Sequence, residues 1–202
     1  MPSLNEIQQY LTGSWRMMMG KPDGLRLLDI TADGFWDSFF AIAIALPALI
    51  AGWVALTNSV APVAVPFATR LSILLRLATV DIGAWVLPLV AFVLAARPAG
   101  LADKVAHYVV SSNWGSALIV WMMLPPTLLR MFFPGADEVA SAISIGLFIL
   151  SLVLSWRLTN SALGKGAGIA SGVFGAMFVI SLIVLYLLQL VLGLGSLEPV
   201  TG

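Results

Sequence analysis

The chain has 202 residues, of which 60% are hydrophobic and only 10% are charged. This balance leaves too little polar surface to coat a globule in water, so it argues against a soluble domain and predicts apolar side chains facing lipid. The net charge of zero gives no reason to expect a nucleic-acid partner, and the absence of cysteine excludes disulfides and thiolate metal sites.

Residues 3–19 are predicted to form an amphipathic helix that lies on the membrane. Ser3 and Glu6 have the spacing of a capping box at its start. Its predicted apolar face consists of residues that recur at helical intervals, namely Leu4, Ile7, Leu11, Trp15 and Met18. This face could dock a partner or the cytoplasmic leaflet, or it could cover the cytoplasmic end of a bundle, the alternative that we favour. With the turn-rich connector that follows, the helix makes up a cytoplasmic segment over residues 1–34.

Five long apolar stretches fill residues 35–202. Each has at least about the 17–25 residues that a helix needs to cross the bilayer core. The stretches cover residues 35–56, 71–96, 114–133, 139–156 and 166–194. The sequence therefore predicts an all-α polytopic membrane protein with five transmembrane helices in one bundle, in addition to the N-terminal interfacial helix.

Lysine and arginine are unevenly divided between the two sides of such a bundle. Seven lie on the side of the N-terminus, and three, which are Arg70, Arg76 and Arg130, lie on the other side. Because short basic loops remain in the cytoplasm, we expect a cytoplasmic N-terminus and a C-terminus outside. The short loops favour a bacterial inner membrane.

The second span carries the most unusual polar residues, Arg76 and Asp81. They are five positions apart, about 140° around a helix, so they do not stack on one face. We expect Asp81 to pair with a cation from another helix, and Arg130 near the outer end of the third span is the predicted partner. A carboxylate at this depth without a partner would be costly. Arg76, Asp81 and Arg130 thus form a candidate intramembrane polar site, serving either a proton or ion path or a structural ion pair.

The third span is expected to follow a short cytoplasmic helix within residues 97–113. This helix would contain His107, the single histidine of the chain. No second ligand of a suitable type is near it, so no metal site is expected. Pro125 and Pro126 are expected to break the span itself. Discontinuous helices occur at transporter sites, although a proline pair is also an ordinary kink.

The fifth span has a packing pattern of small residues. Gly168, Gly172 and Ala176 recur every four positions, and Ser171 and Gly175 form a second row beside them. Small residues at this spacing let two helices approach closely in lipid. We expect the rows to pack within the chain, with a second protomer as the alternative. Gln189 in the same span is expected to find a hydrogen-bond partner inside the bundle.

Two segments of the second half carry a family pattern. The stretch from His107 to Ser112 opens the third span with a Tyr-Ser-type motif, followed here by Asn113 and Trp114 instead of a proline. Trp156-Arg157-Leu158, followed by residues 162–166, leads into the last, small-residue-rich span. In these features and in its topology the chain resembles the Yip family of small integral membrane proteins. The resemblance implies a non-enzymatic protein that acts through partner binding or membrane organisation.

The sequence contains no hydrolase, metalloprotease or phosphate-binding motif, so no catalytic residue and no cofactor is expected. The leading hypothesis is a scaffold or accessory subunit of a membrane assembly. Its partners would be the lipid bilayer and either other membrane subunits or further copies of the chain. The alternative is a small transporter or channel that uses Asp81 with Arg76 or Arg130.

Overall fold

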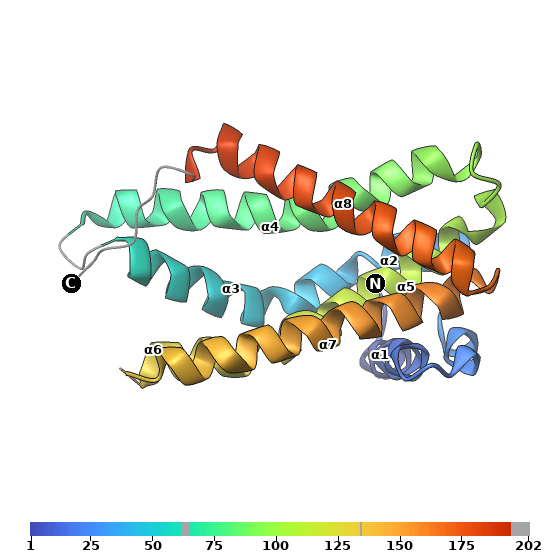
Figure 1. The fold of residues 1–202 in the computed structure, drawn as a ribbon, viewed down its shortest axis with the longest axis horizontal. Coiled ribbons are helices and arrows are strands. Elements are labelled where there is room, and N and C mark those ends of the chain that lie inside the picture. Colours follow the sequence, from blue (N-terminus) through green and yellow to red (C-terminus); the bar gives the residue numbers. More distant parts are fainter. Residues whose placement is uncertain (62–64, 134, 195–202) are drawn as a thin grey trace.

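A computed structural model describes residues 1–61, 65–133 and 135–194, and Figure 1 shows their arrangement. Within these residues no strand forms, and five helical segments are long and apolar enough to cross a membrane. The predicted all-α polytopic fold with five spans is therefore confirmed.

Several of the spans are divided or flanked by short helices. The N-terminal part consists of α1 (Leu4–Met18) and the 3-10 helix η1 (Pro22–Leu27). The spans are formed by α2 (Ala32–Asp37) with α3 (Phe40–Val60), α4 (Phe67–Ala96), η2 (Ala102–Lys104) with α5 (Val105–Met122) and α6 (Leu124–Phe132), α7 (Asp137–Leu163), and α8 (Ala167–Val191).

The third and fourth spans begin or end at other residues than predicted. α5 begins at Val105 and buries Tyr108, so the short separate helix expected within residues 97–113 is in fact the start of this span. α7 continues beyond Trp156 to Leu163. The hydropathy pattern misplaced the start of the third span and the end of the fourth, because the helical turns at these two places contain polar residues that are buried by packing. The predicted break at the proline pair is confirmed, since α5 ends at Met122 and α6 begins at Leu124.

The helices run back and forth, so their connections gather at two ends of the bundle (Figure 1). One end, called here the α1 end, holds α1, η1, η2 and the turn between α7 and α8. The far end holds the end of α3, the start of α4, α6 and the start of α7.

α5 is the central helix of the bundle. It contacts α1, α2, α3, α4 and α7. Its residue Trp114 is 1% exposed, and its ring lies 5.3 Å from that of Tyr10 in α1. In contrast, α8 lies at the periphery, where it packs on α4 and α7 and buries only Ala170 and Met177. α4 in turn packs more extensively on α8 than on α3 or α5.

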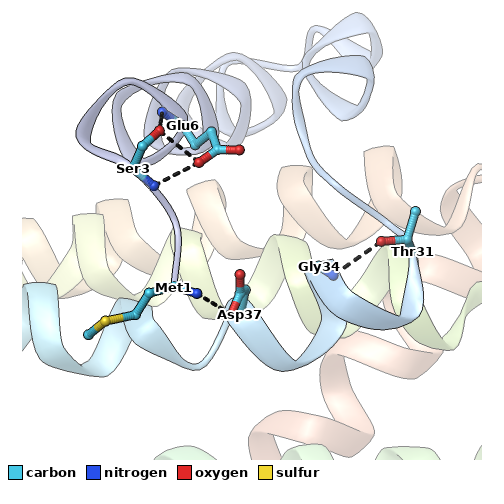
Figure 2. A network of polar contacts seen from close by, with 6 residues as sticks. All are labelled: Met1, Ser3, Glu6, Thr31, Gly34 and Asp37. Atoms are coloured by element: carbon cyan, nitrogen blue, oxygen red, sulfur yellow. Dashed lines mark hydrogen bonds and ion pairs between the residues drawn. The ribbon is translucent and has the colours of Figure 1, made fainter.

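α1 lies across the spans at one end of the bundle, and Figure 1 views it end-on while the spans run lengthwise. Its capping box forms as predicted: the Ser3 backbone N–H donates to Glu6 Oε2 at 2.7 Å, and the Glu6 N–H donates back to Ser3 Oγ (Figure 2). Helix α1 packs on α5 and α7, which agrees with the favoured role of covering the end of the bundle.

The face of α1 that packs is not the predicted one. Ile7 and Met18 are buried as expected, but Leu4 is 83% exposed and Trp15 is 43% exposed. Leu11 is half-buried, while four residues outside the predicted face are buried, namely Tyr10, Gly13, Ser14 and Met17. The packed face differs in part because it includes Gly13 and Ser14, whose small side chains allow close approach and which a pattern of apolar residues leaves out. A membrane-surface or partner-docking role for Leu4 and Trp15 stays a prediction.

Candidate functional site

Asp81 lies midway along α4, where it accepts a hydrogen bond from an indole and not from a cation. The Nε1 atom of Trp53 in α3 donates to Asp81 Oδ2 at 2.6 Å. Among the described residues, ion pairs join Met1 to Asp37, Arg16 to Asp23 and Lys165 to Asp103, and none of them includes Asp81. The carboxylate therefore couples α3 to α4.

The two arginines of the predicted polar site donate hydrogen bonds to groups other than Asp81. Arg76 Nη1 donates to the carbonyl oxygen of Leu192 at 3.2 Å, which joins α4 to the end of α8. Arg130 Nη2 donates to Ser141 Oγ at 3.0 Å, which joins α6 to α7. The predicted pairing of Asp81 with Arg130 is wrong, and Arg76 does not meet Asp81 either, because each of the three side chains faces a different neighbouring helix.

Four tryptophans each donate their indole N–H to a neighbouring span. Besides Trp53, the donors are Trp85 to Asn113 at 2.9 Å, Trp121 to the Ile44 carbonyl at 2.9 Å and Trp156 to Ser171 at 3.0 Å. These bonds join α4 to α5, α5 to α3 and α7 to α8, respectively. In an apolar solvent such bonds supply directional contacts that hydrophobic burial cannot supply.

Asn113 is the buried polar residue that sequence reasoning missed. Its side chain is 0% exposed, and its Nδ2 atom donates to Ser38 Oγ at 2.8 Å while its Oδ1 atom accepts from Trp85. Ser38 donates in turn to the Phe35 carbonyl at 2.7 Å. One amide thus ties α4, α5 and the α2–α3 junction together. The available signal was an amide directly beside the predicted third span, since an asparagine that a span takes in must be hydrogen-bonded.

The small-residue rows of α8 face outward. Gly168, Ser171, Gly172, Gly175 and Ala176 are all exposed. A Cβ atom added at any of the three glycines would meet nothing within 4 Å. Trp156 of α7 reaches the edge of the rows through its hydrogen bond to Ser171. The expected packing inside the chain is therefore wrong, because α8 turns Ala170, Val173 and Met177 to the bundle instead.

Gln189 also lies on an exposed part of α8. No side-chain hydrogen bond of Gln189 forms within the described ranges, so the expected partner inside the bundle is absent. The reason is again the peripheral position of α8, which packs on the bundle along one side only.

A cavity of about 230 Å³ lies between α4, α5, α7 and α8, and Met18 of α1 also lines it. Hydroxyl groups line it in two facing rows: Tyr108, Ser112 and Ser116 on α5, and Ser155 and Thr159 on α7, with Ser181 of α8 beside them. The spacing of four residues places each row on one side of its helix. Among the described residues, no charged side chain lines this cavity.

The N-terminal part is held together by polar contacts outside the spans. Arg16 of α1 forms an ion pair with Asp23 of η1, and Gln9 Nε2 donates to the Leu27 carbonyl at 2.9 Å. The hydrogen bond from Arg16 holds the pKa of the Asp23 carboxyl below its ordinary value. The hydroxyl and the N–H of Ser3 likewise lower the pKa of Glu6.

No protein-family model, curated protein or solved structure matches the chain. The fold itself defines an all-α membrane protein whose five-span bundle has a short helix docked across one end. Within the described ranges, no three His, Asp or Glu side chains gather as a metal site requires. The similarity to the Yip family stays a prediction.

Proposed function

We propose that the chain is a non-catalytic accessory or scaffold subunit of a membrane assembly, similar in role to what the Yip resemblance implies. The observation that carries this proposal is the outward position of the α8 rows, Gly168, Gly172 and Ala176 with Ser171 and Gly175. In lipid, rows of small residues allow two helix backbones to approach closely. A row that its own bundle leaves uncovered is therefore suited to a helix of another chain.

A cross-linking experiment tests this role directly, because the chain has no cysteine of its own. Val179 flanks the rows on α8 and is 53% exposed, whereas Ile145 on α7 is 61% exposed and distant from the rows. Single variants Val179→Cys and Ile145→Cys would each carry a thiol-linked photo-cross-linker in native membranes. We expect Val179→Cys to capture one defined membrane protein, or a second copy of the chain, and Ile145→Cys to capture mainly lipid. Lipid alone at both positions would contradict the proposal.

For the location, we propose a bacterial inner membrane with the α1 end in the cytoplasm and the C-terminus outside. The support is the distribution of lysine and arginine, seven toward the α1 end and three toward the far end. Reporter fusions after residue 202 and before residue 1 test the orientation. A C-terminal reporter that is active only in the periplasm supports it, and one that is active only in the cytoplasm overturns it.

A second function, transport of a proton or small ion, has one observation in its favour. Asp81 sits midway along a membrane-spanning helix and, within the described residues, no cation pairs with it. Carboxylates in such positions commonly serve ion pathways. In Asp81→Asn the amide oxygen can still accept from Trp53, so the fold should persist. Loss of ion flux from proteoliposomes of a stably folded Asp81→Asn variant would favour transport, and unchanged flux would exclude it.

A further inference from the structure

The hydroxyl-lined cavity has a chemistry that none of the roles above uses. Tyr108 lies within hydrogen-bonding reach of Ser112 and Thr159, and Thr159 Oγ1 donates to the Ser155 carbonyl at 2.9 Å. In contrast, the hydroxyls of Ser116, Ser155 and Ser181 donate to no group within the described chain, although they line the same space. Each can therefore donate to a molecule inside the cavity.

The walls exclude a charged occupant. A phosphate, carboxylate or ammonium group taken out of water needs an opposite charge nearby, and the described lining residues supply none. The remaining walls are apolar and include Trp85, Leu152, Phe174 and Phe178. An occupant must therefore combine an uncharged oxygen-bearing head with an apolar body.

The size of the cavity and its surroundings indicate how such a molecule would sit. A cavity of roughly 150 Å³ holds a benzene-sized molecule, so about 230 Å³ holds a small polar head with its first few methylene groups. Phe174, Phe178 and Ser181 on α8 are half-buried, as is Leu152 on α7. Between these two helices the apolar tail can continue into the bilayer.

We propose that this cavity binds the head of a neutral membrane lipid, held by hydroxyls of α5, α7 and α8. Diacylglycerols and isoprenoid quinones both fit this description, because each has an uncharged head whose oxygens accept hydrogen bonds. This site is separate from the outward rows of α8. The proposal of lipid binding can therefore be tested independently of the partner proposed at those rows.

Photo-labelling of the full chain in nanodiscs tests the proposal. A diazirine analogue of dioleoylglycerol is irradiated, and labelled peptides are mapped by mass spectrometry. We expect labels on the cavity-lining segments of α5, α7 and α8. Competition by unlabelled dioleoylglycerol or by a quinone shows which of these two classes of neutral lipid the cavity prefers. Phosphatidylglycerol, which is anionic, should not compete.

Matched variants separate the cavity from the outer surface. Ser155→Phe fills the cavity, while Val153→Phe introduces the same side chain two residues away, at a position that is 47% exposed. We expect at least a tenfold loss of cavity labelling in Ser155→Phe and less than a twofold change in Val153→Phe. Ser116→Ala with Ser181→Ala keeps the shape and should weaken labelling about five- to twentyfold. A thermal unfolding midpoint measured for each variant shows that the fold is retained.

The proposal is overturned if labels appear only on lipid-facing residues, or if neither neutral lipid competes. It is overturned equally if phosphatidylglycerol competes as well as the neutral lipids. Unchanged cavity labelling in the double alanine variant would show that the hydroxyls do not hold the head.

Discussion

The indole nitrogen of Trp85 and the amide oxygen of Asn113 are 2.9 Å apart, and their hydrogen bond joins α4 to α5 in the interior of the bundle. Replacing Asn113 by Leu removes the amide, so the Trp85 N–H loses its acceptor and Ser38 Oγ loses its donor. Because a buried polar group that loses its partner costs about 1–3 kcal/mol, we expect a clear drop in the thermal unfolding midpoint in detergent.

The same network gives a control through a double-mutant cycle. Trp85→Phe and Asn113→Ala each break the bond between α4 and α5, so their combined effect should be smaller than the sum of the two. Additive effects would show that the Trp85–Asn113 bond contributes nothing to stability.

A second prediction concerns the crossing of α1 and η1. At Gly13, a Cβ atom would lie 2.8 Å from the carbonyl oxygen of Gly24, and backbone cannot move aside as a flexible side chain can. We expect Gly13→Ala to loosen η1 at a cost of about 1–3 kcal/mol, measured by thermal unfolding and by faster hydrogen exchange in η1. Gly52→Ala is the control, because a Cβ atom there meets nothing within 4 Å. Equal effects of the two variants would contradict close packing at the crossing.

The contact of α1 with η1 should depend on pH. In the folded chain the pKa of Asp23 lies below its ordinary 3.8, first through the hydrogen bond of Arg16, and that of Glu6 lies below its ordinary 4.5, first through Ser3. A carboxyl with a lowered pKa contributes stability above its ordinary pKa and loses that stability as the pH falls through the folded value. We therefore expect full protection of α1 and η1 above about pH 5 and progressive loss below the two ordinary values.

Hydrogen exchange, corrected for the intrinsic dependence of the rates on pH, measures this loss. The variant Asp23→Asn with Glu6→Gln should exchange at the same corrected rate across the acidic range. If the unmodified chain shows no acid-dependent loss of protection over residues 4–27, the two carboxyls do not stabilise the N-terminal part.

A fourth prediction distinguishes the two sides of α8. Ala170 is 0% exposed, so Ala170→Leu should overpack the bundle and cost about 1–3 kcal/mol. At Gly172 a Cβ atom meets nothing, so Gly172→Leu should change the stability of the isolated chain by less than about 0.5 kcal/mol. Gly172→Leu should nevertheless remove the proposed partner from material purified in mild detergent. A large loss of stability in Gly172→Leu would place the row inside the fold and contradict its outward position.

Much of the architecture could be predicted because span length, proline and capping signals act locally. The five spans, the break at Pro125 and Pro126 and the Ser3–Glu6 capping box depend on short segments alone. The direction in which each helix faces depends on its neighbours. Asp81 could not be assigned to Trp53 from its position in α4, since the partner is chosen by the packing of α3.

The small-residue rows illustrate the same limit. Their spacing predicts a close helix–helix contact, but it is identical for a helix of the same chain and for one of another chain. Only the packing of Ala170 and Met177 on the bundle fixes the rows on the other side of α8. The cavity was missed because Tyr108, Ser112 and Ser116 were divided between an expected loop helix and the third span.

The extensive packing of α4 on α8 has a consequence for biosynthesis. Ala167, the first residue of α8, follows Ala96, the last of α4, by 71 positions. When α4 leaves the ribosome, the helix that will cover much of its surface has not yet been translated. Trp53, the hydrogen-bond partner of Asp81, is already present in the preceding span at that stage, whereas the surface that α8 covers stays exposed to the bilayer until the last span is inserted.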